Sequence, residues 1–149
     1  MNLSANTQRW LDRMRSEIDG LPAGERTVVA TMYLAEAEYA LGQLEAARGT
    51  LARTVARFDF LHPGNWTSLV DRAAELCGQL GENQLLGTEL LRGLAWLAQP
   101  EIVKYQTRLP DCVRDIAIQV GRADVATKLT SHEWPGLCAE FASHCPARD

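Results

Sequence analysis

Histidine and cysteine are the side chains with which this chain could do nucleophilic, acid–base or metal chemistry. The histidines are His62, His132 and His144, and none of them lies in a recognisable nucleophile motif. The patterns GxSxG and HExxH and the phosphate-binding P-loop are absent from the sequence. The sequence therefore offers no catalytic residue, and we expect neither an enzyme nor a bound cofactor.

Soft metal ligands gather in the C-terminal stretch CAEFASHC, which holds Cys138, His144 and Cys145, with His132 a little upstream. Cysteine and histidine are the usual ligands of Zn²⁺. The spacing matches no zinc finger, however, and on a helix His144 is turned by about 100 degrees from Cys145. We therefore expect no metal site here and interpret Cys138 as a small buried residue.

Composition and charge exclude several classes of protein. The 149 residues suit one domain, and the formal net charge of −4 argues against a nucleic-acid binder, which needs a basic surface. The first ten residues do not resemble a secretory signal, and no apolar run approaches the length of a membrane helix. We therefore expect a cytoplasmic protein with reduced thiols that binds neither membranes nor nucleic acid.

Apolar residues recur at helical spacing along the chain, whereas no segment alternates as a strand does. The sequence thus predicts an all-α protein of about seven to eight helices. Ser4 or Asn6 is the expected cap of the first helix, and Asn65 or Thr67 that of the fourth. We expect a single α-helical domain over 1–149, with a capping helix at 1–20, helical hairpins at 25–58, 66–98 and 110–131, and a C-terminal helix or tail at 135–149.

Three glycine breaks recur at nearly equal intervals. Gly42, Gly81 and Gly121 are 39 and 40 residues apart. Glycine suits a helix end because the left-handed conformation costs any residue with a Cβ more energy. Apolar residues keep the same offset from each break, as in the sets Leu34, Ala73, Val113 and Ala47, Leu86, Ala126. This register predicts three helical hairpins, each with a tight glycine turn.

The stretch ALGQLEAARGTL resembles the turn and second helix of a tetratricopeptide repeat, in which a small Ala follows the turn Gly by five residues. Gly42 and Ala47 match this pattern, as do Gly121 and Ala126, whereas Leu86 departs from it. The resemblance extends over residues 27–134. It implies antiparallel hairpins stacked as a short superhelix, whose concave groove is lined by the first helix of each hairpin and typically holds a peptide or helix of a partner protein.

The first helices of the three expected hairpins carry the candidate partner-binding residues. Three acidic residues, Glu36, Glu75 and Asp115, share one repeat position, and Asp71 and Asp111 share another. We expect these columns to attract a basic segment of a partner, although a charged face turned to water is the alternative interpretation. The full set of candidates is Met32, Tyr33, Glu36, Tyr39, Asp71, Arg72, Glu75, Asp111 and Asp115.

The expected function is that of an adaptor, chaperone or regulator that binds another protein. A second possibility within this class is that the chain binds another copy of itself as a homodimer. The polar first helix would then cap one end of the domain, and the less polar third hairpin and tail would form the contact. The rival class is an enzyme or small-ligand-binding protein with a pocket between helices, and Glu38 is one candidate for a buried polar group there. All four tryptophans are expected to pack between helices.

Overall fold

The secondary structure follows the predicted series of helices. The computed structural model describes residues 3–130, and within them it contains eight α-helices, two short 3-10 helices and no strand. The all-α prediction and the predicted number of helices are thereby confirmed. The predicted C-terminal helix or tail at 135–149 lies outside the described residues, as do Cys138, His144, Cys145 and Trp134.

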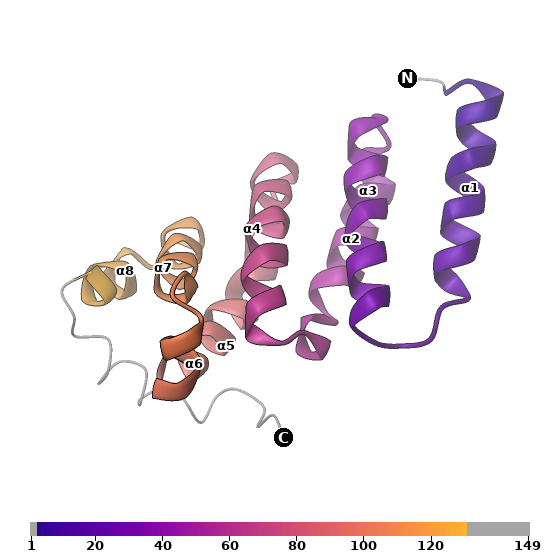
Figure 1. Cartoon of the computed structure of the whole chain (residues 1–149). Helices are drawn as coiled ribbons and strands as arrows, with labels where there is room; N and C mark the ends of the chain where they lie inside the picture. The colour runs from indigo at the N-terminus through magenta and orange to yellow at the C-terminus, as the bar shows by residue number, and fades with distance from the viewer. Residues whose placement is uncertain (1–2, 131–149) are drawn as a thin grey trace. The chain divides into compact units, whose positions relative to one another are not determined.

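The chain divides into two compact units between Leu61 and His62. The N-terminal unit contains α1 (Ala5–Asp19), α2 (Glu25–Ala40), α3 (Leu44–Val55) and the 3-10 helix η1 (Phe58–Phe60). As predicted, the Ser4 side chain caps α1 by accepting a hydrogen bond from the Thr7 backbone N–H at 3.2 Å. Figure 1 shows α2 and α3 side by side after their tight turn.

The core of the N-terminal unit lies mainly between α2 and α3. Val28, Met32 and Ala35 of α2 and Ala47 and Leu51 of α3 are all almost completely buried. Helix α1 adds one fully buried side chain, Leu11. The hairpin therefore carries most of the apolar burial of this unit, and α1 is attached to its side.

The C-terminal unit begins with α4 (Pro63–Leu80), followed by η2 (Asn83–Leu86), α5 (Gly87–Leu97), α6 (Pro100–Tyr105), α7 (Leu109–Gln119) and α8 (Ala123–Thr130). The predicted caps of α4 are wrong, because the helix already begins at Pro63, with His62 at its N-cap position. Proline is favoured in the first helical turn since its fixed φ suits a helix and its missing N–H is not needed there.

The three predicted glycine turns share one backbone geometry. Gly42, Gly81 and Gly121 have φ values of 77°, 71° and 80°, which confirms the expected left-handed conformation. In each turn the N–H after the glycine bonds to a carbonyl five residues earlier, at 2.8, 2.8 and 2.7 Å. This bond is the signature of the Schellman motif, which satisfies carbonyls that the helix end leaves open.

Aromatic packing closes the core of the C-terminal unit. The rings of Trp66 and Trp96 meet edge to face, with centroids 5.1 Å apart and planes at 84°. Both side chains are buried, as predicted, and Gly93 of α5 packs against Trp66 and against Val113 of α7. Trp10 departs from the same prediction because 54% of its surface is exposed.

Helices α4 and α7 contact each other and run in the same direction. A contact near the start of α7, between Arg108 and Asp71 (2.8 Å), involves an earlier residue of α4 than a contact at the end of α7, between Gln119 Nε2 and the Ala74 carbonyl (2.6 Å). Stacked hairpins would place their first helices in this way. The superhelix and the resemblance to a tetratricopeptide repeat nevertheless stay predictions.

Candidate protein-interaction groove

Helix α1 carries an apolar seam beside the face that packs on α2. Trp10 and Met14 lie on this seam, which Leu21 extends just beyond the end of α1 at Asp19, and Glu17 lies between Met14 and Leu21. Leu11 is buried against the rest of the unit, whereas 54% of Trp10 and 44% of Leu21 are exposed. The seam is therefore only partly covered, and it is more apolar than the expected polar capping helix.

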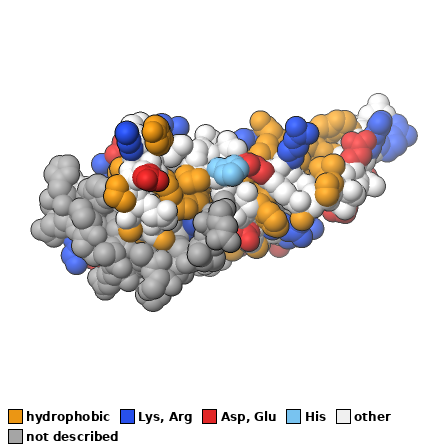
Figure 2. Space-filling model, turned by 60° about the horizontal axis from the view of Figure 1, so that its bottom comes forward, with side chains coloured by type: hydrophobic (Ala, Val, Ile, Leu, Met, Phe, Trp, Pro, Cys, Tyr) orange, Lys and Arg blue, Asp and Glu red, His pale blue; other side chains and the backbone are white. Residues whose placement is uncertain are grey.

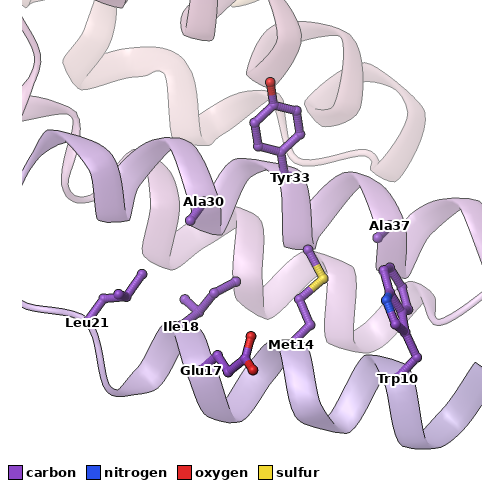
Figure 3. Close-up of a pocket in the computed structure, with 8 residues that line it drawn as sticks. All are labelled: Trp10, Met14, Glu17, Ile18, Leu21, Ala30, Tyr33 and Ala37. Atoms are coloured by element: carbon purple, nitrogen blue, oxygen red, sulfur yellow. The ribbon is translucent and has the colours of Figure 1, made fainter.

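The seam forms one wall of an open groove between α1 and α2 (Figure 3). The Trp10, Met14 and Ile18 side chains project from α1 toward α2, and Tyr33 stands at the rim on the α2 side. The groove has a volume of about 590 Å³, within the range of ligand pockets. Its lining residues, of which only Glu17 is charged, are Trp10, Met14, Glu17, Ile18, Leu21, Ala30, Tyr33 and Ala37.

The candidate residues on α2 have different environments. Met32 is completely buried, so its predicted role at a binding surface is wrong, because it fills the core between α2 and α3. Tyr33 is 54% exposed and lines the groove. Glu36 and Tyr39 are partly exposed. Of the four, Tyr33 is the residue that the structure places in a groove.

The predicted acidic columns are interleaved with arginines. Asp71 lies 2.8 Å from Arg108, and the Arg114 guanidinium lies 3.4 Å from Asp111 and 3.8 Å from Asp115. On the face shown in Figure 2, acidic side chains are scattered among basic and hydrophobic ones. These cations reduce the local negative charge that would attract a basic partner segment.

The remaining members of the columns add no concentrated charge. Glu75 is exposed and Arg72 is partly exposed. Glu36 belongs to the N-terminal unit, whereas Glu75 and Asp115 belong to the C-terminal unit. The ladder of three carboxylates therefore stays a prediction, and the apolar groove is the better defined surface.

A buried polar cluster lies beneath a second hollow of the N-terminal unit, about 550 Å³ in volume. Glu38 is 1% exposed, as the rival interpretation expects of a buried carboxylate. Its Oε2 accepts two hydrogen bonds from Arg15, at 2.7 and 3.0 Å, and its Oε1 accepts one from the Thr50 hydroxyl. Because α1, α2 and α3 each contribute one of these residues, the cluster ties the three helices together.

A second buried carboxylate, Glu89, was not predicted from the sequence. Its Oε1 accepts a hydrogen bond from the Trp66 indole N–H at 2.8 Å and from Arg92 Nε at 3.0 Å. Glu89 is 1% exposed and Arg92 is 7% exposed. Their separation by three residues predicts an ion pair on a helix. It does not predict burial, because an exposed ion pair has the same spacing.

The two described cysteines are protected thiols. Burial, and secondarily the Glu82 carboxylate, raises the pKa of Cys77 to about 12. Burial and then the neighbouring Asp71 carboxylate raise the pKa of Cys112 to about 12. Both therefore stay protonated near neutral pH and are poor nucleophiles and poor metal ligands. Residues 3–130 contain no group of three potential metal-binding side chains.

Comparison with family models, curated proteins and solved structures finds no match to this chain. No helix within residues 3–130 has the length and apolar character needed to cross a bilayer. The fold thus places the protein in the all-α class, and its function has to be inferred from the groove itself.

Proposed function

We propose that this chain is a protein–protein interaction module of the cytoplasm, an adaptor, chaperone or regulator that binds a helix or peptide of another protein. The groove between α1 and α2 is its binding surface. The observation that carries the proposal is the gathering of two half-exposed aromatic side chains, Trp10 and Tyr33, along an apolar groove. Trp and Tyr are enriched among the residues that dominate binding energy at protein interfaces.

The shape of the groove suits an amphipathic helix. Helices α1 and α2 form its two walls, and the α2 wall presents the small side chains of Ala30 and Ala37. Small side chains allow a bound segment to approach the α2 backbone, and the larger Met14 and Ile18 supply contact area opposite. A partner helix would insert side chains spaced by three or four residues, as in other helix-in-groove complexes.

The rival function, a small-ligand site around Glu38, has weaker support. Both carboxylate oxygens of Glu38 already accept hydrogen bonds, from Arg15 and Thr50. A ligand would have to replace these bonds, which are better explained as a tie between helices. A thermal-shift screen separates the two functions, because stabilisation by metabolites favours the ligand site and stabilisation by a purified partner favours the module.

The experiment that tests the proposal is site-specific photo-crosslinking in cells of the source organism. A photo-reactive amino acid replaces Tyr33 in the groove, and the matched control replaces Tyr105, which is 75% exposed and lies on α6. We expect Tyr33 to give a discrete protein adduct that Tyr105 does not give, and we expect Trp10→Ala to remove it. The proposal fails if both positions give the same adducts or if the adduct persists in Trp10→Ala.

A further inference from the structure

We propose that the partner in the groove is a second copy of this chain, whose α1 lies antiparallel along α1 of the first copy. This inference rests on the proposed function, because it names the occupant of the same groove. It differs from the sequence expectation, which placed a homodimer contact at the third hairpin and the tail. Three properties of α1 carry the inference: its seam spacing, its charges and their common centre.

The seam of α1 has the spacing of a coiled-coil contact. Trp10, Met14 and Glu17 of α1 follow one another at intervals of four and three residues, and Leu21 follows four residues later, just after the helix ends at Asp19. This is the alternation by which one helix presents a continuous stripe to another. The stripe is open to solvent at both ends, since 54% of Trp10 and 44% of Leu21 are exposed.

The charges on and beside the seam are self-complementary. Arg13 and Glu17 form an ion pair at 3.0 Å within α1, and their side chains are 79% and 66% exposed. An exposed pair of this kind contributes little to stability, so either partner is easily shared with another chain. In an antiparallel pair of α1 helices, Arg13 of each copy faces Glu17 of the other. A parallel pair would instead bring like charges together.

The apolar and charged residues share one centre of symmetry. The midpoint between Arg13 and Glu17 is residue 15, and the midpoint between Trp10 and Leu21 falls half a residue later. A twofold axis level with Arg15 pairs Arg13 of each copy with Glu17 of the other and places each Trp10 opposite the C-terminal end of the other α1, where Leu21 follows, as a symmetric dimer requires.

The size of the seam predicts a weak, reversible dimer. Helix α1 has 15 residues, which corresponds to a length of about 22 Å. An interface built on one helix and the rim of α2 is smaller than the ~800 Å² per partner of a standard stable complex. We therefore expect a dissociation constant of roughly micromolar order, with dimer and monomer both populated.

The test is a charge-reversal exchange, measured by sedimentation velocity over a concentration series. We expect the wild type to dimerise and the single variants Arg13→Glu and Glu17→Arg each to be at least tenfold weaker dimers. An equimolar mixture of the two single variants regains the dimer, because every contact between the copies is then attractive. Circular dichroism confirms that each variant is folded.

A matched control reverses an exposed charge elsewhere. Arg122 forms an ion pair with Asp124 at 3.1 Å in the C-terminal unit. If the two copies meet through α1, Arg122→Glu leaves the dissociation constant of the dimer unchanged. The inference is overturned if the wild type is a monomer throughout, if the mixture does not regain the dimer, or if only Arg122→Glu weakens it. A monomeric wild type that still crosslinks from Tyr33 to a different protein would refute the dimer and leave the proposed function standing.

Discussion

The guanidinium of Arg15 donates two hydrogen bonds to one carboxylate oxygen of Glu38, from Nη2 at 2.7 Å and from Nε at 3.0 Å. Arg15 lies on α1 and Glu38 on α2, so this contact joins the two helices that form the walls of the groove. The Glu38 side chain is 2% exposed and that of Arg15 is 29% exposed. The pair therefore positions α1, together with the fully buried Leu11.

The two ends of this ion pair differ in burial, which predicts unequal effects of mutation. Arg15→Ala leaves a buried carboxylate with Thr50 as its remaining donor, and we expect a loss of about 3 kcal/mol in the free energy of unfolding. Glu38→Ala leaves a cation that reaches water, so we expect a loss of roughly 1–2 kcal/mol. Urea denaturation measures both values. The opposite order would contradict the assignment of Glu38 as the desolvated partner.

Two glycines in different backbone conformations predict changes of opposite sign. Gly81→Ala places a Cβ in the left-handed region, at φ 71°, and should destabilise the protein by about 1 kcal/mol. Gly49 lies within α3, where an added Cβ would meet nothing within 4 Å beyond its own helix, so Gly49→Ala should stabilise by about 0.5–1 kcal/mol. Thermal melting of both variants checks this, and equal shifts would argue against the turn geometry.

Gly93 marks a close approach of α5 to α7. A Cβ at this position would lie 2.6 Å from Val113 Cγ2 and 3.1 Å from Trp66 Cη2. Valine cannot easily rotate away because its χ1 is restricted, so we expect Gly93→Ala to cost about 1–3 kcal/mol. Val113→Ala removes the obstacle. In a double-mutant cycle, the pair of substitutions should therefore destabilise less than the sum of the two single changes.

The raised pKa values of Cys77 and Cys112 predict protection and a pH dependence. At neutral pH both thiols should resist alkylation in the folded protein and react in denaturant, which peptide mass spectrometry resolves. Each pKa is about 12 in the fold, above the ordinary value of 9.0. This contribution to stability is thus complete below about pH 9 and is lost as the pH rises toward 12. Rapid alkylation of either thiol in the native state would contradict the burial.

The secondary structure was predictable because its determinants are local. Helical spacing of apolar residues indicated the helices, and the three glycine turns were expected to be left-handed before their φ values were known. A glycine at a helix end adopts this conformation for reasons that involve only its own backbone and its nearest neighbours in the chain. The start of α4 was missed because Pro63 begins the helix before either predicted cap.

The groove was only partly predictable. Tyr33 was a candidate, but Met32 beside it is fully buried, since neighbouring positions on a helix point about 100 degrees apart and the sequence does not say which one faces the core. The helical spacing of apolar residues was recognised along the chain, and Trp10 was assigned to packing between helices. Their spacing is the same whether the stripe is covered or open.

By itself, the sequence determined that this protein is built of helices and where most of them end, because propensity, periodicity and turn chemistry act over a few residues. The tertiary structure decided which stripe of α1 is buried and which is left to solvent. That choice depends on contacts between distant parts of the chain, above all Arg15 with Glu38, 23 residues apart. The docking of α1 through this pair and Leu11 leaves Trp10 at the surface, and so creates the groove.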